Sequence, residues 1–416
     1  MIKNGLVDDA NQKTVEIMLA GDPVLTDIKP AIEVIPEMSN ETILHAGPPI
    51  SWKEMCQAQK NAVIGGILFE GLADSHEKAI KLVERGEVIL SPCNDHATVG
   101  GMTGITTASM SVYVVKNLKY GNTAFCNHHE GWPIKALHWG NNDTEVLTHL
   151  RWLDHVLTPV LRFAIKEMGG LNVKTIVSKA LNMNDECHSR CTAATALFIT
   201  EIAPYLAMSD LDRDGVKQSL EFLRRSEIFF LHIIMPAIKS VVEPAKGIEY
   251  STIVTNQAGN GVEFGIKVSS LGEEWFTGPA SPIDGLYLPG FGSKDAGLDI
   301  GDSGVTELGG LGGFAIAASP SVLLMKGGTT EQALEQTKQM AKITVAKNPF
   351  FTIPYLNFEG APFGIDIRKV IETGITPFID NAIAHKNGGL IGSGIARAPI
   401  QCFEKAIQAF KKKYQQ

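Results

Sequence analysis

The chain has 416 residues, which is long for a single hydrophobic core, so two or three domains are expected. Its 44% hydrophobic and 20% charged residues, with no low-complexity tract, are typical of a globular protein and exclude a disordered or fibrous one. The net charge of −8, from 37 basic and 45 acidic residues with no basic stripe, argues against a nucleic-acid partner.

The N-terminal stretch has no signal-peptide core, and the longest apolar runs, such as 228–234, are too short to cross a bilayer. Six cysteines are scattered without a CxxC pair, as expected for reduced cytosolic thiols. Cys187, His188 and Cys191 could supply only two or three metal ligands, so buried thiols are the preferred interpretation. We expect a cytoplasmic protein with no membrane segment, no metal and no cofactor.

Residues 1–142 alternate between helical and strand patterns, which predicts an α/β domain. Ser51 is expected to begin a helix, with Glu54 at the capping-box position. The other predicted elements are helices at 11–20, 27–38 and 75–85 and strands at 42–46 and 88–90.

Residues 143–247 have a different pattern, with apolar residues recurring every three or four positions and almost no glycine after Gly170. Helices are predicted at 188–207, 213–224 and 226–243. Residues 248–416 return to strand-like runs, with a helix at 330–346, a strand at 377–384, a glycine-rich loop at 387–394 and a last helix at 399–413. The predicted fold is therefore α/β, with two α/β lobes (1–142 and 248–416) and a mainly helical insertion domain (143–247) between them.

Several common catalytic patterns are missing from the sequence. It contains no G-x-x-x-x-G-K-[ST], no G-x-S-x-G and no H-E-x-x-H, so NTPase, hydrolase and zincin assignments lose their best support. The run from Gly310 to Ala315 matches G-x-G-x-x-A, but no clear strand precedes it. We therefore regard it as a weak dinucleotide signal.

A Gly- and Thr-rich stretch at 93–110 separates two predicted strands. Successive backbone N–H groups in such a turn can surround an anion, and hydroxyls add further donors. The stretch contains no Lys or Arg, so positive charge would have to come from elsewhere, and a tight strand connection is an equal alternative. The candidate anion-binding residues here are Gly100, Gly101, Thr103, Gly104 and Thr106.

A second glycine-rich stretch, 385–397, runs from a predicted strand toward a predicted helix start, where N–H groups and the helix dipole favour anions. The guanidinium of Arg397 can bind phosphate or carboxylate through two parallel hydrogen bonds, and Lys386 and His385 lie at the strand end. We prefer an anion site to a structural turn. We predict that Lys386 and Arg397 face residues 100–106 across a cleft.

Further candidates come from three acidic or histidine-containing segments. Among the carboxylates at 290–313, whose spacing is not that of an EF-hand, we keep Asp302 with Ser303 and interpret the remainder as a turn-rich lid. His188 and Arg190 precede a predicted helix, although Arg190 could simply pair with Glu186. Glu130, in a His-His-Glu-Gly run after a strand, is an acid–base candidate.

At these residues the chain resembles the YlbE/YahG-like bacterial family, whose members are encoded beside FdrA-like proteins. The resemblance covers essentially the full length. The chain departs from the family pattern at one place, where the family has Asn-Glu-Gly and this chain has His129-Glu130-Gly131. The segments that carry the resemblance are 44–49, 68–71, 101–110, 185–190, 275–277, 301–303, 364–368, 372–377 and 384–399.

One branch of that family is similar to a subunit of oxamate carbamoyltransferase in anaerobic allantoin (purine) breakdown. The resemblance implies phosphorolysis of oxalurate to oxamate and carbamoyl phosphate, with an FdrA-like protein and a third subunit as partners. We therefore predict an oligomeric carbamoyltransferase subunit with small anionic substrates and a site built from residues 95–107, 301–303 and 385–397. Arg190, Arg368, Lys386 and Arg397 are expected to bind anions, and His385, His188 and Glu130 to serve as acid–base groups.

Two alternatives from other classes remain open on the sequence. The chain could be a non-catalytic assembly subunit that binds an FdrA-like protein, or a component of a CoA- or nucleotide-dependent acyl ligase. Binding of phosphate, carbamoyl phosphate and oxalurate, or of ADP and CoA, distinguishes them.

Overall fold

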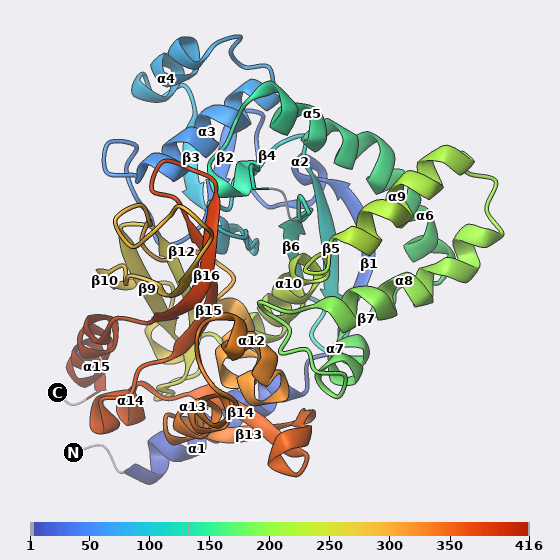
Figure 1. The fold of residues 1–416 in the computed structure, drawn as a ribbon. Helices are drawn as coiled ribbons and strands as arrows, with labels where there is room; N and C mark the ends of the chain where they lie inside the picture. The colour runs from blue at the N-terminus through green and yellow to red at the C-terminus, as the bar shows by residue number, and fades with distance from the viewer. Residues whose placement is uncertain (1–3, 132–133, 415–416) are drawn as a thin grey trace.

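The computed structural model describes residues 4–131 and 134–414 and combines helices with several small sheets, which confirms the α/β class (Figure 1). Most strands pair in antiparallel fashion. Among the named strands of the described chain, β2 (Thr42–His45) and β3 (Ile89–Pro92) form the one parallel pair. The sheets therefore differ from a doubly wound parallel sheet, in which sites form at the carboxyl ends of the strands.

The first sheet has the order β6-β5-β1-β7, and the buried helix α10 (Leu231–Val242) packs against it. The helix predicted at 27–38 is wrong, because most of it belongs to strand β1 and to the one-turn helix α2 (Ala31–Val34). Prolines at both ends of β1 and its pairing with β5 favour extended backbone over a helix. The strands are β1 (Pro23–Pro30), β5 (Ser111–Asn117), β6 (Thr123–Asn127) and β7 (Leu171–Asn172).

A small sheet has the order β3-β2-β4, with β4 at Thr106–Thr107. Helices α3 (Gln57–Phe69) and α4 (His76–Glu84) lie near this sheet. The helix predicted at 75–85 is confirmed, since the Ser75 side chain caps α4 by accepting from Lys78 N. The cap predicted at Ser51 is wrong: its hydroxyl donates to Glu54, and the helix begins only at Gln57.

The helices predicted between 188 and 243 are confirmed, because the three- and four-residue periodicity is a local signal. In Figure 1, α5, α6, α8 and α9 form the green to yellow-green group at one side of the first sheet. The same segment also adds strand β7 to that sheet. The helices are α1 (Asn4–Leu19), α5 (Thr144–Trp152), α6 (Thr158–Glu167), α7 (Val173–Leu181), α8 (Thr192–Ala207) and α9 (Arg213–Arg225).

The C-terminal part contains a sheet of order β10-β9-β8-β12, a sheet of order β11-β16-β15 and the ribbon β13-β14. Its strands are β8 (Val254–Asn260), β9 (Glu263–Val268), β10 (Phe276–Pro279), β11 (Asp284–Tyr287), β12 (Ile300–Gly301), β13 (Thr344–Ile353), β14 (Glu359–Ile365), β15 (Phe378–Ala384) and β16 (Leu390–Arg397). Its helices are α11 (Val305–Leu308), α12 (Pro320–Met325), α13 (Thr330–Lys342), α14 (Ile367–Thr373) and α15 (Ile400–Tyr414).

The glycine-rich loop predicted at 387–394 is wrong, because most of it is strand β16 in an antiparallel hairpin with β15. Glycine is needed there for close packing: a Cβ at Gly392 or Gly394 would lie 2.3 Å from a carbonyl oxygen of strand β11. The glycines therefore allow β11 to approach β16 and do not form a flexible turn.

One contiguous apolar core extends from Val15 to Ala406 and includes residues from all three predicted segments, 1–142, 143–247 and 248–416. The division into those domains stays a prediction. The six cysteines are free thiols, five of them buried. Over the described ranges, every helix is too short or too polar to cross a membrane.

Candidate active site

A cavity of about 170 Å³ lies where the loop around Gly101, the segment at 188–189, the start of α10, the end of α12 and the β15–β16 hairpin meet. Each of the three candidate segments from the sequence, 95–107, 301–303 and 385–397, therefore contributes residues to its wall, together with His188. The polar residues on its wall are His129, His188, Ser189, His232, Ser303, Lys326, Asn381 and Ser393.

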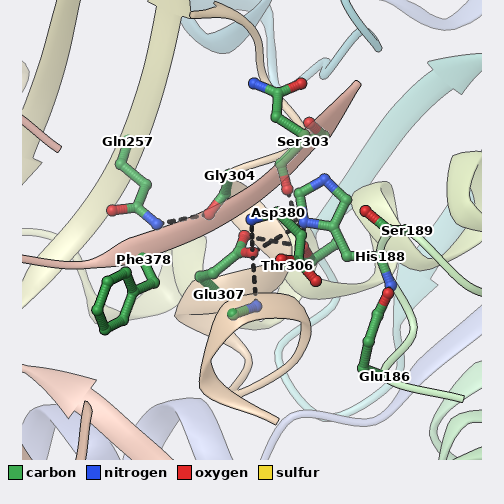
Figure 2. Close-up of polar contacts among 12 residues, drawn as sticks. Glu186, His188, Ser189, Gln257, Ser303, Gly304, Thr306, Glu307, Phe378 and Asp380 are labelled. Carbon is green, nitrogen blue, oxygen red and sulfur yellow. Dashed lines mark hydrogen bonds and ion pairs between the residues drawn. The ribbon is translucent and has the colours of Figure 1, made fainter. Parts of the chain in front are cut away.

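His188 is paired with a buried carboxylate at this wall. Its Nδ1 lies 2.8 Å from Glu307 Oε1 and 3.0 Å from Thr306 Oγ1 (Figure 2). The same Glu307 oxygen accepts backbone N–H groups from Gly313 and Asp380, at 3.1 and 3.2 Å. A carboxylate held in this way fixes the proton of the neutral ring on Nδ1 and leaves Nε2 available to a bound molecule. His188 and Glu307 thus have the geometry of an acid–base pair.

The glycines at 312–313, which matched a dinucleotide pattern in the sequence, surround this pair. A Cβ at Gly312 would lie 2.2 Å from Glu307 Oε1 and 2.9 Å from His188 Nδ1. Residues 312–314 form a short 3-10 helix, and its Gly313 N–H donates to Glu307 Oε1, while the N–H groups of Gly312 and Phe314 donate to backbone carbonyls. The carboxylate of the chain itself therefore occupies the position of an anion.

Lys326 is a site residue that the sequence analysis missed. It is buried at the end of α12, with Nζ 3.2 Å from Asp380 Oδ1 and 2.9 Å from both Ser189 Oγ and Gly394 O. Its sequence signal is a single Lys between an apolar helix and two glycines. That signal becomes informative only when Asp380 is known to face it.

The segment before α8 is organised by two buried carboxylates. Glu186 accepts the backbone N–H groups of His188 and Arg190, at 2.8 and 2.7 Å, and so fixes the turn that carries His188. Burial raises the pKa of Glu186, as does Asp380, while Lys326 lowers it. The Arg190 guanidinium pairs with Asp185, with Nε 3.4 Å from Oδ1, and not with Glu186 as the alternative proposed.

A group of buried imidazoles forms the other end of the cavity. The ring centroid of His129 is 4.8 Å from that of His232 and 5.1 Å from that of His138. Burial lowers the pKa of His232 to about 4 and that of His129 well below its ordinary value, so both rings are neutral at pH 7. A Cβ at Gly101 would lie 2.6 Å from His232 Nε2, so only glycine permits this approach.

Glu130, predicted as an acid–base group, holds the turn at 137–139. Its carboxylate accepts the backbone N–H groups of Leu137 and His138 at 2.9 Å, and it lies 2.8 Å from His138 Nδ1. Although burial raises its pKa, His138 and these donors bring the pKa below its ordinary value. This ionised carboxylate is a structural anchor outside the residues that line the cavity.

One backbone donor of the stretch at 100–106, Gly100 N, binds a carboxyl group of the chain itself, that of Asp302. The Asp302 carboxylate accepts from Gly47 N, Asn94 Nδ2 and Gly100 N, each at 2.9 Å. Two further backbone donors of the stretch are engaged, since Thr103 N donates to His138 O and Gly104 N to Gly101 O, while Thr106 belongs to β4. These contacts oppose binding of an external anion at Gly100, Thr103 and Gly104, because their N–H groups already have acceptors within the chain, and the role of Gly101 stays a prediction.

Lys386 and Arg397 do not complete that stretch. Lys386 is exposed in the β15–β16 turn, where Nζ donates to Lys294 O at 2.9 Å. Arg397 is exposed at the far end of β16, with its guanidinium 4.2 Å from the Phe378 ring centroid. The predicted cleft between these cations and residues 100–106 is wrong, because the hairpin places the two cations at opposite ends of one strand pair.

Two other predicted residues are engaged elsewhere. His385 lies in the same hairpin turn, and its Nδ1 accepts from Asn387 N at 3.0 Å. Arg368 forms ion pairs with Asp366 and Asp8, each at 2.8 Å, and Asp366 also accepts from Thr252. Arg368 is thus committed to an ion-pair network that joins the chain's N-terminal helix to α14. Within the described ranges, no three His, Cys, Asp or Glu side chains are grouped to hold a metal ion.

Comparisons with known proteins agree on one family. A family model described as oxamate carbamoyltransferase subunit AllG matches residues 88–303. The chain is 44% identical to the uncharacterized protein YahG of Escherichia coli K12 over 407 residues, which is 97% of this chain and 86% of that protein. It is 41% identical to oxamate carbamoyltransferase subunit AllG of the same organism over 408 residues, 97% of both.

One crystal structure has the same fold over nearly the whole chain. It is a conserved protein of unknown function from Enterococcus faecalis V583, which matches with a TM-score of 0.95 and 42% identity over 98% of each chain. Together with the near full-length relatives, this likeness confirms the resemblance inferred from sequence motifs. The chain belongs to the family described as oxamate carbamoyltransferase subunit AllG.

Proposed function

We propose that the chain is a subunit of a carbamoyltransferase that converts oxalurate and phosphate into oxamate and carbamoyl phosphate in anaerobic allantoin breakdown. The observation that carries the proposal is the His188–Glu307 pair on the wall of a small cavity, in a chain whose family is described as an oxamate carbamoyltransferase subunit. An FdrA-like protein and a third subunit are its proposed partners.

The proposed reaction moves a carbamoyl group between two nucleophiles. An oxygen of hydrogen phosphate attacks the terminal carbamoyl carbon of oxalurate, and the bond from that carbon to the inner nitrogen breaks. The proton released by hydrogen phosphate ends on the inner nitrogen, which leaves as the amide of oxamate. Atoms and charge balance without an oxidant or cofactor.

His188 suits the proton transfer in this scheme. Nε2 would take the proton from the attacking phosphate and deliver it to the leaving nitrogen, while Glu307 stabilises the imidazolium formed in between. The Ser303 hydroxyl on the same wall could donate to the carbonyl oxygen as negative charge develops there. Lys326 and Glu186 would position the segment at 188–189 and would not react themselves.

The test is reconstitution. The chain is mixed with its FdrA-like neighbour and the third subunit, supplied with oxalurate and phosphate, and carbamoyl phosphate is measured. We expect product with the complete set and a loss of roughly 10²–10⁴-fold for His188→Gln. No product from the complete wild-type set would overturn the substrate assignment, and full activity of His188→Gln would overturn the assigned site.

An assembly subunit that binds no substrate is the second candidate. It is favoured by one observation: the Lys326 ammonium on the cavity wall is already paired with Asp380. Calorimetry of the isolated chain with oxalurate, phosphate and carbamoyl phosphate separates the two candidates. Binding of any of these three compounds opposes the assembly role, and the absence of binding by all three supports it.

A further inference from the structure

The cavity has no cation available to a ligand among the described residues that line it. Lys326 is the only Lys or Arg on this part of the wall. Its Nζ donates to Ser189 Oγ and Gly394 O and forms an ion pair with Asp380 Oδ1 at 3.2 Å, so its charge is already paired. An ammonium in this state cannot compensate a second anion without breaking an existing contact.

Carboxylates lie directly behind the same wall. Asn381, on the wall, donates from Nδ2 to Asp299 Oδ1 at 2.6 Å, and His188 is paired with Glu307. Burial, together with the electrostatic effect of Glu307, raises the pKa of Asp299 to about 7. A phosphate dianion placed in this cavity would be desolvated beside like charges, which is unfavourable.

The wall instead presents hydrogen-bond acceptors. One N–H of Asn381 Nδ2 is used by Asp299, which leaves the Asn381 carbonyl oxygen, together with the second N–H, for a ligand. His232 Nδ1 lies 2.9 Å from Asn127 O and donates to it, which leaves the lone pair of Nε2 on the side of Gly101. The hydroxyl of Ser303 also lies on the wall, and it can donate or accept.

Acceptors on a neutral wall are complementary to a ligand that carries N–H donors. We infer that the cavity binds the N–H-bearing end of a small ureido or primary carboxamide compound through His232 Nε2 and Asn381 Oδ1, and that phosphate stays outside it. The choice of a ureido group rests on the proposed function. The exclusion of phosphate rests on the contacts of Lys326 and the carboxylates behind the wall. The phosphate of the proposed reaction would then be held at the cavity mouth or by another chain.

The experiment compares three probes on the isolated full-length chain by calorimetry at pH 7.5. Acetylurea carries a neutral ureido group, and diacetamide has the same shape with a methyl group in place of the terminal NH2. Inorganic phosphate tests the anion. We expect acetylurea to bind about tenfold or more tightly than diacetamide, because a site built for N–H donors loses hydrogen bonds with the methyl analogue. Phosphate should give no binding in the same concentration range.

Two variants of His232 separate hydrogen bonding from packing. His232→Asn keeps a donor near the position of Nδ1 and removes the Nε2 acceptor, whereas His232→Gln places an amide oxygen near the position of Nε2. We expect His232→Asn to weaken acetylurea about tenfold and diacetamide little, and His232→Gln to retain most of the acetylurea affinity. If either variant fails to fold, the three-probe comparison on the wild-type chain still decides the matter.

Equal binding of acetylurea and diacetamide, no binding of acetylurea, or phosphate binding at least as tight as acetylurea would each overturn the inference. Its failure is distinguishable from failure of the proposed function. An active reconstituted enzyme whose chain prefers phosphate over acetylurea would overturn this inference alone. A chain that selects acetylurea but yields no carbamoyl phosphate in the complete set would overturn the proposed reaction alone.

Discussion

His188 Nδ1 lies 2.8 Å from Glu307 Oε1, although the two residues are 119 positions apart in the chain. Gly312 makes the contact sterically possible, and Glu186 holds the turn that presents His188. The pair is therefore built by two segments, 186–188 and 307–312, that are far apart in the chain. It also defines the first experimental comparison.

Replacing Glu307 with Gln should lower the activity of the assembled enzyme strongly. The amide cannot stabilise an imidazolium at His188, so a loss of roughly 10²–10³-fold in kcat is expected, with a smaller change in KM. Steady-state assays of carbamoyl phosphate check this. His385→Gln, in the exposed β15–β16 turn, is the matched control and should keep wild-type kinetics. Equal losses in the two variants would contradict the assignment of His188.

Replacing Gly312 with Ala should destabilise the fold and disturb the pair. The new Cβ would overlap Glu307 Oε1, and overpacking of this kind typically costs about 1–3 kcal/mol of unfolding free energy. Gly374→Ala is the control, because Gly374 also has a positive φ (67°, against 56° for Gly312) but has open space around its Cβ position. Urea unfolding of both variants separates steric overlap from backbone strain. Equal destabilisation would mean that φ alone matters.

Replacing Lys326 with Met should cost about 3–5 kcal/mol of unfolding free energy, because it leaves the buried Asp380 carboxylate without its cation. The double variant Lys326→Met with Asp380→Asn should recover part of that loss, because it removes the unpaired charge. A double-mutant cycle from denaturant unfolding measures the coupling. Additive effects of the two single changes would contradict a direct ion pair.

Replacing Asp299 with Asn should flatten the pH dependence of stability between about pH 4 and pH 7. Burial, aided by Glu307, raises the pKa of Asp299 to about 7, so the folded state binds a proton there that the unfolded state has already lost. Its contribution is present at low pH and is lost as pH rises through this window, by a few kcal/mol. Unfolding free energies measured from pH 4 to pH 8 check this. Asp210→Asn on the surface should leave the slope unchanged, and an unchanged slope for Asp299→Asn would contradict the prediction.

Local patterns in the sequence were sufficient for much of the secondary structure. The helices α8, α9 and α10 followed from apolar spacing, and the helix predicted at 75–85 is confirmed as α4. The motifs at 101–110 and 185–190 identified the family, which the near full-length relatives confirm. His188 and Ser303, both candidates from the sequence, line the same cavity, and their roles stay predictions.

Other features depended on residues far away in the chain. Glycine at 392 and 394 suggested a loop, yet it marks the close approach of β11, which has no local signal. Lys386 and Arg397 were predicted at an anion site because they flank those glycines, and the antiparallel hairpin separated them from it. Lys326 escaped notice because its partner Asp380 lies on another strand.

The sequence by itself determined the family, the helical segments and the presence of glycine-rich turns able to surround negative charge. Only the tertiary structure decided which anions those turns hold. Asp302 accepts from Gly100, and Glu307 accepts from Gly313, so two turns that suggested phosphate sites are occupied by the chain's own carboxylates. The physical reason is that buried N–H groups must find acceptors, and a long-range fold can supply them from any part of the chain.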